Sequence, residues 1–103
     1  NHHNICNNIY KLIDKLFFMA DKSPQMLSHY VGSFQFIARG YLEYGDSEGA
    51  DSSRRNLLSK LRGLHADSAV TSCIDYLEKT SWKTHPEVDN FVRYSEGLIR
   101  NQK

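Results

Sequence analysis

Apolar side chains recur at intervals of three or four residues along most of the chain, which is the spacing of one face of an α-helix. Five such stripes follow one another: Ile5, Ile9, Leu12, Ile13, Leu16 and Ala20; Leu27, Tyr30, Val31, Phe34, Ile37, Ala38, Tyr41 and Leu42; Leu57, Leu58, Leu61 and Leu64; Val70, Cys73, Ile74 and Leu77; Val88, Phe91, Val92, Ser95, Leu98 and Ile99. No stretch alternates strictly between apolar and polar residues for long enough to indicate a strand. We therefore predict an all-α fold, with a single domain over residues 1–103 built as a compact bundle of four to five antiparallel helices and no sheet.

Capping signals precede three of the predicted helices: Ser23 with Pro24, Asp67 or Ser68, and Thr84 with Glu87. The first is an N-cap with a first-turn proline, and the last has the spacing of a capping box. Residues 45–53, which read GDSEGADSS, are rich in glycine and polar groups. We predict that they form the main loop of the bundle.

The charge balance argues against a strong electrostatic field. Of the 103 residues, 13 are Lys or Arg and 12 are Asp or Glu, so no global attraction to nucleic acid or to an anionic membrane is expected. The densest apolar run, residues 16–20, falls far short of the roughly 20 residues that span a bilayer, so we expect no membrane span. A cytoplasmic location is favoured, and a periplasmic or secreted one is left open. The chain begins with Asn1, so it is a mature form, a trimmed chain or an excised domain, and the sequence leaves these three alternatives open. His2 and His3 are either native or part of a tag.

Few residues suggest reactive chemistry. Cys6 and Cys73 lie on predicted apolar helix faces, so free buried thiols are favoured over a disulfide. His3 and Cys6 have the spacing of half a zinc site on a helix, but no C-x-x-C pair completes it, so we expect no metal and no cofactor. The sequence contains no glycine-flanked nucleophilic serine and no phosphate-binding loop, which indicates a non-enzymatic protein.

Residues 57–82 raise the question of nucleic-acid binding, because two apolar-periodic segments flank a short break there. This stretch loosely resembles the DNA-reading unit of winged-helix repressors. The resemblance is carried by Leu57, Leu61, Gly63 and Leu64, followed by Val70, Ile74, Leu77, Glu78 and Lys79. It implies a helix-turn-helix regulator that contacts nucleic acid through Arg54, Arg55, Lys60, Arg62, Ser68, Thr71 and Ser72.

The chain departs from that pattern in several ways. Arg62 adds a residue before the glycine, and no wing hairpin is visible after Trp82. The second helix offers outward Ser and Thr but no Arg or Asn for strong base contacts, and Asp75 would be repelled by phosphates. We therefore favour two ordinary bundle helices over DNA reading. Arg62 with His65 is also similar to part of the motif of helical ribonucleases, although at a shorter spacing, which leaves a helical hydrolase or nuclease as a second alternative.

Gly32, Phe36 and Gly40 lie four residues apart on a side of the second helix away from its main stripe. Glycines inside a helix cost about 1 kcal/mol each relative to Ala, and they allow another helix to approach closely. Two explanations are open. The pattern favours a central helix buried on two sides over a docking face on the surface.

The first functional hypothesis is a small non-enzymatic module that binds another protein through a helix face, as a regulator, an adaptor or an immunity-type inhibitor. Aromatic residues and arginine are enriched at the centres of protein interfaces. The predicted contact residues are Phe36, Tyr41, Tyr44, Arg54, Arg55 and Trp82. The identity of the partner is open, and a homodimer is one of the alternatives.

Overall fold

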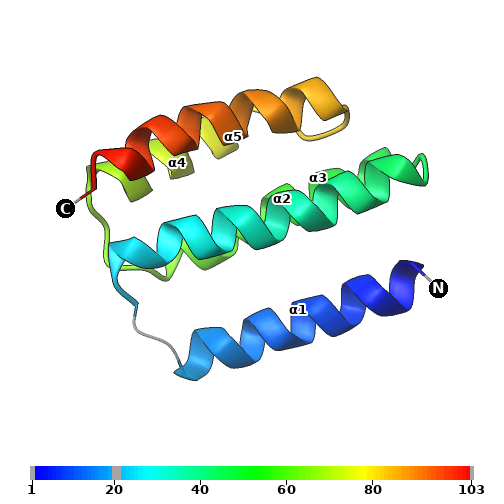
Figure 1. Cartoon of the computed structure of the whole chain (residues 1–103), viewed down its shortest axis with the longest axis horizontal. Helices are drawn as coiled ribbons and strands as arrows, with labels where there is room; N and C mark the ends of the chain where they lie inside the picture. Colours follow the sequence, from blue (N-terminus) through cyan, green and yellow to red (C-terminus); the bar gives the residue numbers. More distant parts are fainter. Residues whose placement is uncertain (1, 20–21, 103) are drawn as a thin grey trace.

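The computed structural model describes residues 2–19 and 22–102, which form five α-helices and one short 3-10 helix. These elements are α1 (His2–Met19), η1 (Pro24–Met26), α2 (Leu27–Glu43), α3 (Ser47–Arg62), α4 (Ser68–Glu78) and α5 (His85–Arg100). No strand occurs in these two ranges, so the predicted all-α fold is confirmed. In Figure 1 the chain runs from right to left in α1, from left to right in α2 and from right to left in α5.

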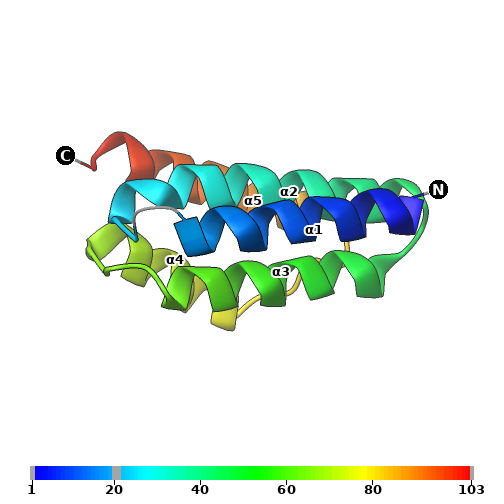
Figure 2. The ribbon, with the colours of Figure 1, turned by 90° about the horizontal axis from the view of Figure 1, so that it is seen from below.

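The helices are arranged around one hydrophobic core. Figure 1 shows α2 between α1 and α5, and Figure 2, seen from below, shows α1 lying along both α2 and α3. Tyr10 of α1 makes both contacts. Its ring lies 5.9 Å from that of Phe34 on α2, and its hydroxyl is 2.9 Å from that of Ser53 on α3. No helix among the described residues is long and apolar enough to cross a bilayer.

The apolar stripes of the second, third and fourth predicted helices form most of this core. The largest fully buried side chains are Trp82, Phe34, Phe91, Leu27, Ile37, Leu57, Leu61 and Leu77. All predicted core positions of α2 are buried except Leu42, which is partly buried. Helical periodicity therefore predicts the buried side of α2 correctly.

The buried side of α1 was predicted only in part. Cys6 and Ile13 are buried, whereas Ile5 and Leu12 remain 58% and 60% exposed. Ile9 is half-buried, and the predicted core positions Leu16 and Ala20 lie outside the side chains that the structure describes. The apolar arc of α1 is wider than the surface that α2 and α3 cover, so one edge of it faces outward.

The predicted loop over residues 45–53 is wrong. Helix α3 begins at Ser47, and the carboxylate of Asp46 caps it by accepting a 2.8 Å hydrogen bond from the backbone N–H of Gly49. A Cβ on Gly49 would lie 2.4 Å from Cδ1 of Tyr41, so this glycine allows the close approach of α3 to α2. The small polar residues are helix-packing residues here, and Gly45, with φ of 72°, provides the turn.

Of the three predicted caps, only Asp67 caps a helix through its side chain, while Ser23 and Thr84 hold N-cap positions without a side-chain cap hydrogen bond. Asp67 accepts a 2.9 Å hydrogen bond from the backbone N–H of Val70 at the start of α4. Before α5, the carboxylate of Glu87 accepts from the hydroxyls of Ser81 and Thr84, at 2.8 and 3.2 Å, and from the backbone N–H of Lys83 at 3.0 Å. Glu87 therefore closes the connection between α4 and α5.

Candidate protein-binding surface

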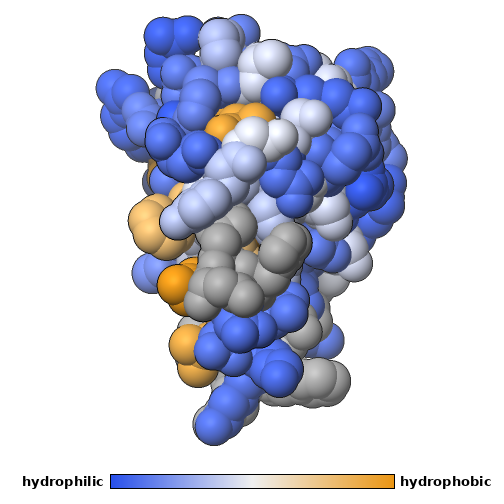
Figure 3. Space-filling view, turned by 90° about the vertical axis from the view of Figure 1, so that its right-hand side faces the viewer, coloured by the Kyte–Doolittle hydropathy of each residue, from blue (hydrophilic) through white to orange (hydrophobic). Residues whose placement is uncertain are grey.

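Three large apolar side chains are exposed on adjacent helices. They are Ile5 and Leu12 of α1 and Phe36 of α2, and Phe36 is 64% exposed. Ile9, which lies between the first two on α1, lines the same hollow as Phe36 and Gly32. We name the surface formed by Ile5, Ile9, Leu12, Gly32 and Phe36 the Phe36 face. Figure 3 shows apolar side chains gathered along the left edge of the molecule, on the side where α1 and α2 lie.

The Phe36 face lies on the side of α2 opposite to its core stripe. Successive helical residues are 100° apart, so Gly32 and Phe36 point away from the buried Phe34 and Tyr41. A Cβ built on Gly32 would meet no atom within 4 Å. The favoured explanation of this glycine pattern, a helix buried on two sides, is therefore wrong for Gly32 and Phe36, which are exposed, while Gly40 is half-buried.

Two hollows meet at Gly32. The first, of about 510 Å³, lies on the α1 side and is lined by Ile9, His29, Ser33 and Phe36 among others. The second, also of about 510 Å³, lies between α2 and α5, with Val31, Val92 and Ile99 in its wall. Because Gly32 has no side chain, it forms a low ridge between them. The surface can therefore receive a protruding side chain on either side of α2.

The structure separates the aromatic residues that were predicted to contact a partner. Phe36 and Tyr44 are exposed, but Tyr41 is only 8% exposed and Trp82 is fully buried. Trp82 packs against Phe91, with 5.6 Å between the ring centroids. The prediction is therefore corrected for Tyr41 and Trp82, because both side chains are used to build the core.

Asp51, which was not recognised from the sequence, organises two of the predicted basic contact residues. It is 5% exposed and accepts hydrogen bonds from Nε of Arg54 at 2.8 Å, from Nη1 of Arg55 at 2.7 Å and from the backbone N–H of Trp82 at 2.9 Å. Burial opposes ionisation of this carboxyl, yet the hydrogen bonds from Arg54 and Trp82 and the two guanidinium charges hold its pKa below the usual value. Arg54 also donates to the carbonyl of Leu77, so it ties α3 to α4.

The remaining residues of the nucleic-acid hypothesis do not form a basic surface. Nη2 of Arg62 pairs with Glu78 across α3 and α4 at 2.6 Å. Ser68 and Thr71 are exposed and Ser72 is half-buried, while Lys60 on α3 is half-buried. Close to them Asp75 pairs with Lys79 at 3.1 Å. The side of the helix pair that was compared with a DNA-reading unit therefore carries both signs of charge.

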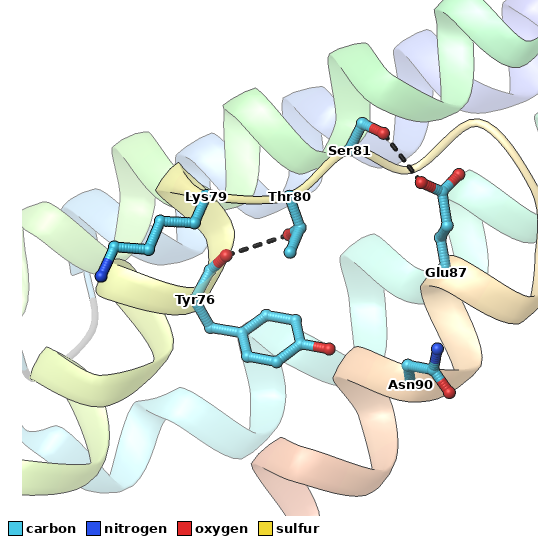
Figure 4. A pocket seen from close by; sticks show the side chains of 6 residues that line it. All are labelled: Tyr76, Lys79, Thr80, Ser81, Glu87 and Asn90. Atoms are coloured by element: carbon cyan, nitrogen blue, oxygen red, sulfur yellow. Dashed lines mark hydrogen bonds between the residues drawn. The ribbon is translucent and has the colours of Figure 1, made fainter.

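A polar pocket of about 450 Å³ lies between the end of α4 and the start of α5. Figure 4 shows its lining by Tyr76, Lys79, Thr80, Ser81, Glu87 and Asn90. The hydroxyl of Thr80 donates to the carbonyl of Tyr76 at 3.0 Å, and that of Ser81 donates to Glu87. Hydrogen bonds from Ser81 and from the backbone of Lys83 lower the pKa of Glu87, so this carboxylate stays ionised and is a weak proton acceptor. These groups hold the connection between the two helices together.

The two thiols are buried. Cys6 and Cys73 are not joined by a disulfide in the structure, and both side chains lie in the core. Burial raises the pKa of Cys73 to about 12, and burial also raises the pKa of Cys6. Because the thiolate is the nucleophile and the metal ligand, both groups are weak in either role. No group of three metal-binding side chains occurs in the described part of the chain, which does not include the side chain of His3.

Comparison of the whole chain with protein-family models, with curated proteins and with solved structures finds no match in any of the three.

Proposed function

We propose that this protein is a small non-enzymatic module that binds another polypeptide through the Phe36 face. The observation that carries the proposal is the exposed ring of Phe36 beside the open Gly32, in one hollow with Ile9 of α1, the helix on which Ile5 and Leu12 are also exposed. Contiguous exposed apolar side chains typically mark interaction sites, and aromatic residues act as anchors at their centres. Burying the exposed part of Phe36 against a partner contributes about 1–2 kcal/mol.

The state of the titratable groups supports binding over catalysis. A general base or a nucleophile works best with a pKa near the working pH. The pKa of each cysteine is raised by burial, whereas those of Asp51 and Glu87 are lowered by hydrogen bonds that also occupy their oxygens. These four groups are therefore poorly suited to transfer protons or to attack a substrate near neutral pH.

The nucleic-acid alternative has less support because its arginines are used within the molecule. Arg54 and Arg55 share the carboxylate of Asp51, and Arg62 pairs with Glu78. A gel shift with mixed genomic fragments tests this alternative, since binding to phosphates must weaken steeply as salt rises. As a protein-binding module, the chain would serve as a regulator, an adaptor or an immunity-type inhibitor, and these roles differ in the partner that occupies the Phe36 face.

Affinity capture from cells of the native host tests the proposal. The bait is the full chain, as the unchanged protein, as Phe36→Ala and as Tyr94→Ala. Tyr94 is a matched control, because it is another exposed aromatic residue on a helix and it stacks on Tyr76 away from the Phe36 face. We expect the unchanged protein and Tyr94→Ala to retain the same polypeptide, and Phe36→Ala to retain about thirty-fold less, as for an anchor worth about 2 kcal/mol.

Circular dichroism of the three baits shows whether each is folded. The proposal is overturned when folded Phe36→Ala retains as much of every polypeptide as the unchanged protein does. It is also overturned when the unchanged protein retains nothing, including a differently tagged copy of the same chain.

A further inference from the structure

We infer that the occupant of the Phe36 face is a second copy of this chain. A two-fold axis that passes between the two Phe36 side chains relates the copies. The inference rests on the proposed function, since it names the partner of the same surface. Two-fold homodimers use the same patch on both copies. Each residue of the patch must therefore face a compatible residue from the same patch of the second copy. The Phe36 face and the rest of the outward side of α2 meet this requirement in spacing, in shape and in hydrogen-bonding groups.

The outward side of α2 is symmetric about Phe36. Five of its residues are His29, Gly32, Phe36, the half-buried Gly40 and Glu43, at successive intervals of three, four, four and three positions. When two copies of α2 cross antiparallel at Phe36, Gly32 of one copy lies opposite Gly40 of the second copy. In the same register His29 lies opposite Glu43 of the second copy.

The glycines make room for the aromatic rings in this register. Side chains on a helix lean toward its N-terminus, so the ring of Phe36 leans toward position 32 of its own helix. That position lies opposite Gly40 of the second copy, and both residues lack a side chain. No atom lies within 4 Å of a Cβ placed on Gly32, and the adjoining hollow of about 510 Å³ is lined by Gly32 and Phe36 themselves. Gly32 and the hollow beside it therefore leave space for the ring of Phe36 in this register.

The polar groups at the two ends of the surface are complementary, because an imidazole N–H of His29 can donate a hydrogen bond to the carboxylate of Glu43. His29 is exposed, and the side chain of Glu43 is 73% exposed and lies 3.8 Å from Nε2 of His85 in the same chain. The two-fold axis places an imidazole opposite each carboxylate, and it does so twice. It places no carboxylate of Glu43 opposite another. Sliding one helix by a turn would lose both pairs, so they favour the register centred on Phe36.

Helix α1 shows the same symmetry. Ile9 lines the hollow beside Phe36, and Tyr10 packs on Phe34, so this part of α1 is level with the centre of α2. Ile5 lies four positions before Ile9 and Leu12 lies three positions after it. The axis through Phe36 therefore places Ile5 opposite Leu12 of the second copy. Both side chains are mostly exposed in the single chain, and both would be covered in the dimer.

Sedimentation velocity of the full chain over a range of concentrations tests the inference. The proteins are the unchanged chain, Phe36→Ala, Glu43→Lys, the double charge swap His29→Glu with Glu43→Lys, and the control Tyr94→Ala. We expect the unchanged chain and Tyr94→Ala to form dimers. Phe36→Ala should raise the dissociation constant by at least about thirty-fold, because it removes both rings from the interface. Glu43→Lys alone should weaken the dimer by about five-fold, because it affects two surface pairs, and the double swap should restore it.

Three results overturn the inference. The first is an unchanged chain that is folded and stays monomeric at every concentration. The second is a dimer that Phe36→Ala does not weaken. The third is a dimer whose affinity falls with Glu43→Lys and is not restored by the double swap, because that result contradicts the register. If the chain is monomeric but captures a different polypeptide in a Phe36-dependent manner, the proposed function stands and the second copy is excluded. If it is monomeric and captures nothing, both fail.

Discussion

The backbone N–H of Trp82 donates a 2.9 Å hydrogen bond to Oδ1 of Asp51, a residue 31 positions earlier in the chain. Asp51 lies in α3, and Trp82 lies in the connection between α4 and α5. Because the same carboxylate binds Arg54, which donates to the carbonyl of Leu77, one buried charge connects α3 to the end of α4 and to the segment that follows it. The two basic residues that resembled a binding cluster in the sequence are part of this arrangement.

Asp51→Asn is expected to lower the free energy of unfolding at pH 7 by about 3 kcal/mol. The side chain of Arg54 is only 12% exposed, and the substitution leaves its charge without a buried counter-ion. Urea denaturation followed by the fluorescence of Trp82, the single tryptophan, measures the change. Asp75→Asn is the control, since the exposed pair of Asp75 with Lys79 should contribute less than about 0.5 kcal/mol. Equal losses in the two variants would contradict the role of Asp51.

The contribution of Asp51 is expected to disappear in acid. Its pKa is lowered in the folded protein, so its ionised form stabilises the fold fully above the unfolded value of about 4 and loses this effect as the pH falls through the folded value. The difference in unfolding free energy between the unchanged protein and Asp51→Asn should therefore shrink between pH 5 and pH 2. Urea denaturation at several pH values measures it, and a difference that stays constant or grows as the pH falls would be evidence against this linkage.

Gly49→Ala is expected to destabilise the protein by about 1–3 kcal/mol. Its Cβ would lie within 2.4 to 2.7 Å of three ring carbons of Tyr41, which is itself buried between the helices. Gly97→Ala is the matched control in the interior of α5, because a Cβ there meets no atom within 4 Å. That variant should gain about 0.5–1 kcal/mol from helix propensity. Thermal denaturation of both variants is the measurement, and a stabilised Gly49→Ala would show that the close contact with Tyr41 is not needed.

The thiols are expected to react slowly with Ellman's reagent in the native protein. With a pKa of about 12, only about one Cys73 side chain in 10,000 is a thiolate at pH 8, and the residue is fully buried as well. Cys6 is also buried and its pKa is raised by burial. Two equivalents should react rapidly in urea and far less than one over the same time without it. Rapid native labelling of Cys73 would contradict its burial in the core.

Helical periodicity predicted the parts of the fold in which local and long-range preferences agree. In α2 the core positions from Leu27 to Tyr41 lie on a single stripe, and the structure buries that stripe. The cap of α4 at Asp67 was also predictable, because an N-cap needs only its own side chain and a backbone N–H three positions later. Such features depend on neighbouring residues alone.

Residues 45–53 show where composition misleads. Small polar residues are typical of loops, yet they also allow two helices to pack closely, and the sequence does not distinguish the two uses. The contact of Gly49 with Tyr41 and the capping of α3 by Asp46 favour the helix. The role of Asp51 could not be predicted from its neighbours either, because its donor Trp82 comes from a distant part of the chain.

The sequence by itself determined that the chain is helical and where most of its apolar stripes lie, because side chains at helical spacing share a face whatever the rest of the chain does. Only the tertiary structure decided which part of each stripe is covered. It buried Trp82 and Tyr41, and it left Ile5, Leu12 and Phe36 exposed. The physical reason is that burial depends on where other helices lie, and contacts between residues far apart in the chain determine those positions.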